Sequence, residues 1–330
     1  MFTGFSFSIL SSFLFDKSRN DYERKLLNTN SRLIKNYNRI KQMNKKIQEQ
    51  SQKIASDAAE IREKKEIQEK LLKQAGNYQQ LLFQETVPQP INQKISAFGS
   101  ASHHITGDYR YIAEITNHIS GLIILDVTGH GAPAAMMTGI ISKDVDYLFE
   151  TASPKLLTDT GATMKVLNKT LTRERRLSKL IAGIYAVVDT GQNLVHVTCA
   201  GAESAMIYRD GKIQSIKNLN ESLRMDEDCD FTSVTLPIKD KDIILVSSDG
   251  LMDRKLKDGT PLFLVIEAEG DYDEESGDYP EIILDYTQFE EILSKWSKQE
   301  SLADYLGKAL DQQCQLASDD MTIIAVEISC

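Results

Sequence analysis

Apolar residues recur at intervals of seven along the first quarter of the chain. The positions are Leu26, Leu33, Ile40, Ile47, Ile54 and Ile61. This heptad spacing is typical of a helix that pairs with another helix along a narrow seam. From 21 to 80 the chain has no Pro, and its only Gly is Gly76. The pattern therefore predicts an unbroken helical arm over 21–84.

The other seam position of each heptad, the a position, is mostly polar. If the aliphatic residues occupy d positions, the a positions are Asn30, Tyr37, Asn44, Ser51, Ala58, Lys65 and Leu72. Asn at a positions favours two strands at a cost in stability, so we expect a weak parallel coiled coil that makes a homodimer. The alternative is a single amphipathic helix packed on its own domain, which would normally show a wider apolar stripe.

The arm has different neighbours on its two sides. Residues 1–15 are apolar and aromatic but lack the basic region and cleavage site of a signal peptide. We favour a short buried or frayed helix there over a patch that contacts a partner or a membrane surface. After the arm, Pro88 and Pro90 break the helix. We thus divide the chain into an apolar segment 1–20, the arm 21–84 and a domain 85–330.

The domain after Pro90 alternates between short strands and a few helices. Strands are predicted at 91–98, 109–115, 122–127, 180–189, 193–200, 205–208, 233–236, 242–247 and 321–328, and helices at 132–150, 154–175 and 287–315. Hairpins interrupted by a helix pair predict an α+β fold of two stacked antiparallel β-sheets flanked by helices.

Charge separates the arm from the domain. The chain has 330 residues, 41% of them hydrophobic, and a net charge of −10, which argues against a protein that coats nucleic acid. Residues 21–80 contain 14 Lys and Arg against 8 Asp and Glu, a net of +6. Residues 81–330 contain 22 against 39, a net of −17. The four cysteines show no CxxC spacing, so we expect neither zinc nor disulfides and favour a cytoplasmic location.

Aspartates stand at the ends of several predicted strands. They are Asp108, Asp126, Asp249, Asp319 and Asp320. A carboxylate at the end of an interior strand is costly unless something pairs with it, and oxygen-rich clusters suit Mg²⁺ or Mn²⁺. One Asp-Gly after a strand usually marks only a turn, so the signal lies in the set and its order.

Four motifs in this order carry a family resemblance. They are Gly107-Asp108-Tyr109, Asp126 to Gly131 (DVTGHG), Ser248-Asp249-Gly250 and Ser318 to Thr322 (SDDMT). Together they resemble the signature of PPM-type metal-dependent Ser/Thr protein phosphatases, in the bacterial subgroup that includes SpoIIE and RsbU. The resemblance covers roughly 85–330, and the family fold of two stacked antiparallel sheets agrees with the strand pattern.

The resemblance implies a role for each aspartate. Asp126 would bridge two Mn²⁺ or Mg²⁺ ions, assisted by the Val127 carbonyl, and Asp108 would bind one of these ions. Asp126 and Asp108 are therefore the candidate catalytic residues. Asp249 and Asp319 would bind the other ion. Asp320 belongs to the candidate metal set but stands where relatives have Asn or Asp, so it suits a supporting role better.

The resemblance also implies a substrate and a regulator. It predicts hydrolysis of phosphoserine on a STAS-domain protein of the anti-sigma-factor-antagonist type by a water that two ions activate, controlled by the N-terminal coil. A catalytically silent, partner-binding scaffold is the alternative, although all four acidic motifs are present. A receiver domain phosphorylated on Asp126 would need a paired acidic motif and a late Lys, and neither is apparent.

The sequence departs from its relatives at several places. Tyr111 replaces a second acid, and the segment 201–205 replaces Gly-Gly-His-Pro-Pro, which leaves substrate choice and metal affinity open. The acidic stretch 267–281 has no family counterpart, and we expect a solvated loop rather than a calcium site. His130 fits a structural role in its turn at least as well as that of a general acid, and His103 and His104 are expected to be ordinary.

Overall fold

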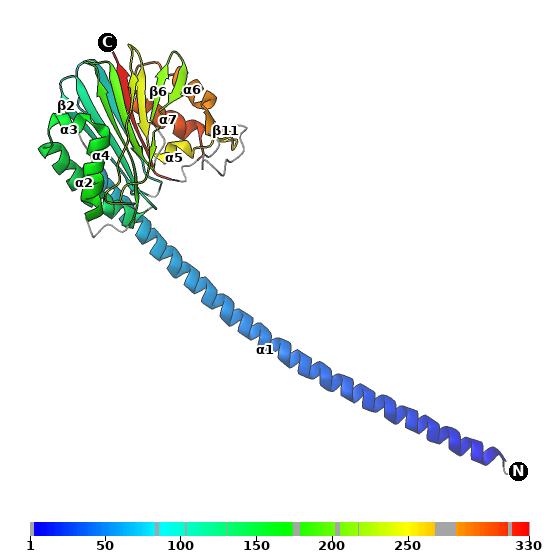
Figure 1. Cartoon of the computed structure of the whole chain (residues 1–330). Coiled ribbons are helices and arrows are strands. Elements are labelled where there is room, and N and C mark those ends of the chain that lie inside the picture. Colours follow the sequence, from blue (N-terminus) through cyan, green and yellow to red (C-terminus); the bar gives the residue numbers. More distant parts are fainter. Residues whose placement is uncertain are drawn as a thin grey trace, which may run out of the picture. The chain divides into compact units, whose positions relative to one another are not determined.

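A computed structural model of the chain describes residues 3–329 except 83–85, 103, 130, 174–178, 202–204, 217, 268–281 and 316–318. Two compact units emerge, residues 1–70 and 71–330 (Figure 1). Each unit is described by itself below.

One helix, α1 (Thr3–Leu82), accounts for all described residues of the first unit and continues into the second. Its side chains from 17 to 70 are all exposed, including the six aliphatic residues of the seam, which are 51–68% exposed. The expected long N-terminal helix is confirmed, and it also includes most of the apolar segment that precedes the arm. Burial of an apolar face supplies most of the stability of a helix, and the aliphatic seam of this single helix is exposed. Pairing along the seam would bury it, and this pairing remains a prediction.

Two antiparallel sheets form the second unit. The first has the order β1-β13-β10-β6-β7 and the second β2-β3-β4-β5-β8, with β9 beside β5. The first contains β1 (Gln93–Ser100), β13 (Met321–Ile328), β10 (Ile243–Ser247), β6 (Ala205–Arg209) and β7 (Lys212–Ser215). The second contains β2 (Asp108–Thr116), β3 (Ile119–Val127), β4 (Ile181–Asp189), β5 (Leu194–Ala200), β8 (Leu219–Asn220) and β9 (Val234–Pro237). Among the described residues, the strand pairings of the two sheets are antiparallel apart from the short β5–β8 pair, which confirms the predicted sheet type.

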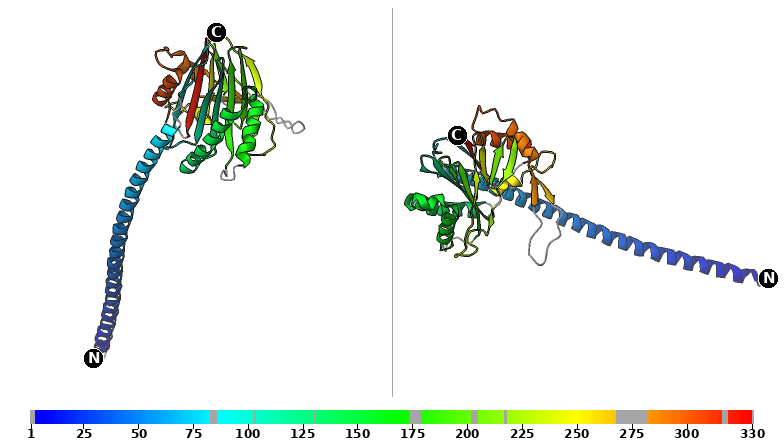
Figure 2. Two further views of the ribbon diagram at one scale, coloured as in Figure 1. Left: turned by 90° about the vertical axis from the view of Figure 1, so that its left-hand side faces the viewer. Right: turned by 45° about the horizontal axis from the view of Figure 1, so that its top comes forward.

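Helices cover the outer faces of the stacked sheets (Figure 2). On the β2–β5 sheet lie α2 (Ala132–Thr151), α3 (Pro154–Thr158) and α4 (Thr160–Arg173), and on the other lie α5 (Asp249–Met252), α6 (Thr287–Ser294) and α7 (Leu302–Gln313). The central core lies between the sheets, where inward residues such as Ile124, Ile184, Ile244 and Ile324 pack together. The alternation of strand side chains therefore buries one face between the sheets and the other under helices.

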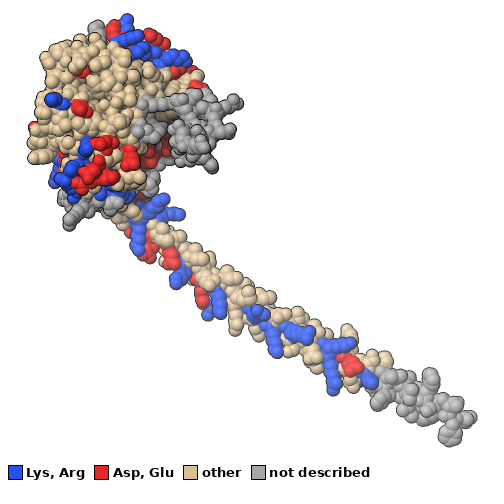
Figure 3. Space-filling model, viewed as in Figure 1, with Lys and Arg blue, Asp and Glu red and all other residues tan. Residues whose placement is uncertain are grey.

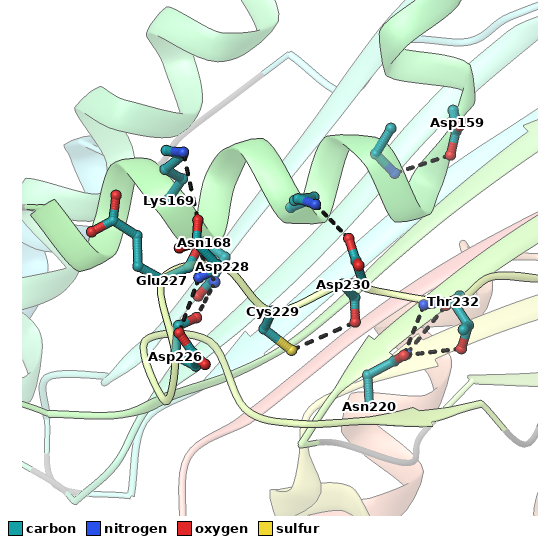
Figure 4. A network of polar contacts seen from close by, with 12 residues as sticks. Asp159, Asn168, Lys169, Asn220, Asp226, Glu227, Asp228, Cys229, Asp230 and Thr232 are labelled. Atoms are coloured by element: carbon teal, nitrogen blue, oxygen red, sulfur yellow. Dashed lines mark hydrogen bonds and ion pairs between the residues drawn. The ribbon is translucent and has the colours of Figure 1, made fainter.

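Polar contacts fasten α4 to the loop that leads into β9 (Figure 4). The Asn168 side chain is fully buried, and its amide nitrogen donates to the carbonyl oxygens of Asp226, at 2.7 Å, and Glu227. Its oxygen accepts from the backbone N–H of Arg224. On the surface, Lys165 pairs with Asp230, Lys169 with Asp228 and Arg173 with Glu227. Leu223, in the same loop, exchanges backbone hydrogen bonds with Ile181 and so fixes the start of β4.

The structure also differs from the sequence-based expectation in detail. The two long predicted helices are each divided, at Asp159 between α3 and α4 and at 295–301 between α6 and α7. A hairpin of β11 (Leu264–Glu267) and β12 (Ile282–Asp285) flanks the acidic stretch, most of which lies outside the described residues. Within the described chain, no helix combines the length and the apolar character required to cross a membrane.

Candidate metal and catalytic site

Asp108 and Asp126 lie opposite each other on neighbouring strands. They are paired in the β2–β3 register, at the end of the sheet where β3 leads into α2. Asp108 is 3% exposed, and the Ser248 hydroxyl donates a 2.8 Å hydrogen bond to its Oδ2. The Ser248 hydroxyl in turn accepts from the backbone N–H of Thr322. Residues of both sheets thus meet at Asp108.

Asp249 and Asp319 come from the other sheet. Asp249 is the first residue of α5, directly after β10, and Asp319 lies in the loop before β13. The two segments touch at Gly250, where a Cβ would lie 1.9 Å from the Asp320 carbonyl oxygen. Glycine is therefore required at 250, and the close approach brings Asp249 and Asp319 together.

The Asp320 carboxylate binds the protein backbone and a hydroxyl group instead of facing the other carboxylates alone. One carboxylate oxygen accepts from both the backbone N–H and the hydroxyl of Ser102, and the other accepts from the Gly107 N–H at 2.7 Å. The side chain is 3% exposed. Three hydrogen bonds to the loop before Asp108 fit the supporting role that we favoured for this residue, since they position Asp108 rather than leave the carboxylate free.

Burial, together with the charges of neighbouring carboxylates, raises the pKa values of the acids in the site. Burial raises the pKa of Asp108 to about 7, and the charges of Asp320 and Asp249 add to this rise while hydrogen bonds from Ser248 and Thr322 oppose it. Burial also raises the pKa of Asp126 to about 8, aided by the charges of Asp108, Asp249 and Asp319. Partial burial and the charge of Asp319 raise the pKa of Asp249. A cluster of this kind is suited to cations, which would remove the repulsion.

The donors fit a hard divalent ion. Asp126 and Asp249 line a small cavity of about 20 Å³, together with Gly201 and Ser248. Among the described residues, no three carboxylate, imidazole or thiol groups are gathered tightly enough to hold one ion by themselves. Mg²⁺ commonly keeps several waters and binds only one or two carboxylates, so it does not need a closed cage of protein ligands. The open arrangement of these carboxylates therefore suits Mg²⁺ or Mn²⁺.

Sequence reasoning missed Gln79, near the end of α1. Its side chain is 9% exposed, and its amide exchanges two hydrogen bonds with the backbone of Thr106, as acceptor at 2.9 Å and donor at 2.8 Å. The Thr106 hydroxyl accepts from the Asp108 N–H. Gly76 allows this packing, because a Cβ there would lie 1.8 Å from the His104 carbonyl oxygen. Gln79 lies seven residues after Leu72 and so continues the series of a positions. A polar residue at this expected seam position was the sequence feature that could have indicated its role.

The other residues that the sequence analysis singled out lie away from the aspartates, at the edge of the cavity, or outside the described residues. Tyr111 packs on Phe149 with ring centroids 4.9 Å apart, on the helix-covered face of β2 and not on the face of Asp108. Gly201 borders the small cavity, but 202–204 are not described. His104 is exposed with a positive φ of 71°, and His103 and His130 lie outside the described residues.

Comparison with known proteins places this geometry in context. The Stage II sporulation protein E (SpoIIE) family matches residues 117–329. The phosphoserine phosphatase RsbU of Bacillus subtilis (strain 168) is 26% identical over 187 residues, which are 56% of this chain and 54% of RsbU. The phosphoserine phosphatase RsbP of the same organism is 27% identical over 165 residues, 48% of this chain and 40% of RsbP. The chain thus spans about half the length of these curated relatives.

A solved structure shows the same fold. The SiaA-PP2C domain of Pseudomonas aeruginosa superposes with a TM-score of 0.57 at 17% identity and covers 81% of this chain and 98% of that domain. The two-sheet arrangement predicted from the strand pattern is therefore that of PP2C-type domains.

Proposed function

Because the chain belongs to the SpoIIE family of PP2C-type domains, we propose that it is a metal-dependent phosphatase that hydrolyses phosphoserine on proteins. The observation that carries the proposal is the meeting of Asp108, Asp126, Asp249 and Asp319 from four separate segments at one end of the stacked sheets. The names of RsbU and RsbP support the substrate class.

The aspartates and one carbonyl would hold two Mn²⁺ or Mg²⁺ ions. Asp126, the Val127 carbonyl, Asp108, Asp249 and Asp319 are the groups that would hold them. When bound, such ions lower the pKa of a water and offset charge on the phosphoryl oxygens. Ser248 holds the Asp108 carboxylate in place with its hydrogen bond, and Asp320 fixes the backbone before Asp108 through Ser102 and Gly107.

An aryl phosphate assay separates this enzyme from a silent scaffold. We expect the full chain to hydrolyse a synthetic aryl phosphate in Mn²⁺ or Mg²⁺ and to stop in EDTA, because the carboxylates cannot activate water by themselves. Turnover in EDTA would contradict the metal mechanism. The scaffold would be favoured if both metals fail to support turnover while calorimetry shows them bound.

We propose a phosphorylated STAS-domain protein as the physiological substrate class. The support is the resemblance to RsbU-type phosphatases and the phosphoserine named for the two curated relatives. We expect a phosphoserine STAS protein to be hydrolysed much more efficiently than a phosphothreonine peptide at equal concentration. Equal efficiency on both would indicate a phosphatase without this specificity.

Pairing of α1 into a parallel homodimer is the third part of the proposal. In an in-register pair, Asp57 at a g position faces Arg62 of the second copy at e, and Lys64 faces Glu69 of the second copy in the same way. Both pairs are attractive. The a and d positions would bury an aliphatic seam that is exposed in the single chain.

The contact between Gln79 and Thr106 gives the paired helix a route to the site. Gln79 bonds the backbone of Thr106, and Thr106 bonds the backbone N–H of Asp108. A cavity of about 240 Å³ beside these residues leaves room for the helix end to move. We propose that pairing of the arm shifts Gln79 and thereby changes the position of Asp108, which would regulate metal binding and activity.

A further inference from the structure

The charge of α1 is concentrated in one stretch. Residues 24–56 contain nine Lys and Arg and one acidic residue, Glu49, whereas 57–73 contain five basic and five acidic residues. All nine cations are exposed. Among the described residues, Lys45 alone of the nine has a carboxylate partner, Glu49 at 3.9 Å. The charge of this stretch is therefore left unneutralised by the chain that carries it.

Eight of the nine cations lie on the side of the helix away from the seam, and Lys41 lies at an e position beside the seam. Five of them recur at intervals of seven, each directly before a seam residue, at the c positions Lys25, Arg32, Arg39, Lys46 and Lys53. Arg24, Lys35 and Lys45 occupy b and f positions beside this row. The row is about 42 Å long at 1.5 Å per residue. In Figure 3 the middle of the helix shows Lys and Arg side chains without Asp or Glu beside them. We call the b, c and f positions of 24–56 the cationic face.

We propose that the cationic face binds an anionic lipid surface. Within 24–56 its positions hold cations, Asn, Gln, Ser and Glu49 and no apolar residue. A protein interface normally has an apolar centre, which this face lacks, whereas a layer of anionic head groups needs only dense positive charge without a fixed register. Each Lys or Arg close to such a surface adds to the attraction, so the row as a whole is sufficient for binding.

The neighbouring sequence distinguishes a lipid surface from a nucleic acid. Residues 1–15, for which the sequence alone favoured a buried or frayed helix, contain five Phe and no charged residue, and Phe15 is 74% exposed, which favours a surface contact instead. An apolar, aromatic stretch next to a polybasic helix supplies the two signals that stable attachment to a bilayer surface requires. A nucleic acid would use the charge alone. Because b, c and f positions lie outside a coiled-coil seam, pairing of α1 leaves the cationic face open.

Vesicle sedimentation of the full chain tests the proposal. We expect binding to vesicles of phosphatidylcholine mixed with phosphatidylglycerol, little binding to phosphatidylcholine alone, and release at about 0.5 M NaCl, where screening is strong. Replacing Arg32, Arg39 and Lys46 with Gln should weaken binding by at least about tenfold. The matched control replaces the exposed residues Lys70, Lys73 and Lys155, which lie outside the cationic face and the seam, with Gln and should bind like the wild type. Gln has a helix propensity close to that of Lys and Arg, and circular dichroism checks that both variants keep the helix.

Three results would overturn the proposal. They are equal binding to both kinds of vesicle, equal losses in the two variants, and tighter binding of duplex DNA or an acidic polypeptide than of the anionic vesicles at the same salt. None of these readouts depends on phosphatase activity, so the proposal stands or falls separately from the proposed function.

Discussion

At the scale of single residues, the five aspartates differ in what holds them. Asp320 accepts three hydrogen bonds and Asp108 accepts hydrogen bonds from Ser248 and Thr322, whereas the Asp126 carboxylate has no hydrogen-bond partner among the described residues. Asp126 also has a pKa raised to about 8. The Asp126 carboxylate thus lacks a protein partner in the site, and the proposed ions would take the place of that missing partner.

The raised pKa values of Asp108 and Asp126 predict a pH-dependent stability of the metal-free protein. Both groups have folded-state pKa values of about 7 and 8 against an ordinary value of 3.8. Between these limits the folded state holds protons that the unfolded state has lost, so the free energy of unfolding falls as pH rises from about 4 to 8. Thermal unfolding in EDTA at pH 5 and pH 8 measures this.

Mn²⁺ provides the control for that measurement. It should restore more stability at pH 8 than at pH 5, because it replaces the protons on the carboxylates. Metal-free protein that is equally stable at both values, or more stable at pH 8, would show that the aspartates are not crowded as described.

At the scale of elements, the sequence predicted strands better than helix ends. All nine predicted strands are present within a few residues, because alternation and turn residues mark them locally. The divided helices carried local signals as well: the Asp159 side chain accepts from the Ala162 N–H, and Ser301 accepts from the Asp304 N–H. These are N-cap contacts that mark a new helix start inside an apparently continuous pattern.

Replacement of Gln79 tests the link between α1 and the site. Gln79→Ala removes both hydrogen bonds to Thr106, so we expect the Mn²⁺ concentration for half-maximal binding to change severalfold while the fold is retained. Titration calorimetry and the thermal transition report these two quantities. Gln74→Ala, an exposed position on the same helix, is the matched control and should behave like the wild type. Unchanged metal binding in Gln79→Ala would remove the proposed route.

Replacement of Asn168 tests the anchor between α4 and the loop before β9. Asn168→Ala leaves the Arg224 N–H and the carbonyls of Asp226 and Glu227 without their buried partner. We expect a loss of about 2–3 kcal/mol in the free energy of unfolding. Lys169→Ala, which removes an exposed 3.7 Å ion pair of the same network, should cost under about 1 kcal/mol. Urea unfolding that gives equal losses would contradict this division between buried and surface contacts.

At the scale of the whole molecule, the sequence predicts which aspartates form the candidate site but not how they are held. Strand-end positions and motif order single out Asp108, Asp126, Asp249 and Asp319 as candidates. Asp320 accepts hydrogen bonds from Ser102, which is 218 positions away in the sequence, and Gln79 bonds to Thr106. Both contacts form only in the folded chain. Contacts between distant segments leave little trace in local patterns.

Dimerisation through α1 is expected for the whole chain. Replacing Ile40, Ile47 and Ile54 with Asp places charges in the seam, and light scattering should report monomers where the wild type gives dimers. A matched variant with Asp at the outward positions Gln42, Gln52 and Ser56 should remain dimeric. Dimers in the seam variant would show that another surface carries the association.

The most direct test of the central claim is phosphate release from a phosphoserine protein by the wild type and by Asp126→Asn, each in Mn²⁺ and in EDTA. We expect release by the wild type in Mn²⁺ alone and loss of release in Asp126→Asn, because the amide preserves the shape of the side chain but removes the charge that would help to hold the ions. The variant should stay folded, and its thermal transition in EDTA at pH 8 should match or exceed that of the wild type, since one repelling charge is gone. Release by the wild type in EDTA, or an Asp126→Asn variant that keeps more than about a tenth of the wild-type rate in Mn²⁺, would contradict a metal-dependent phosphatase centred on Asp126.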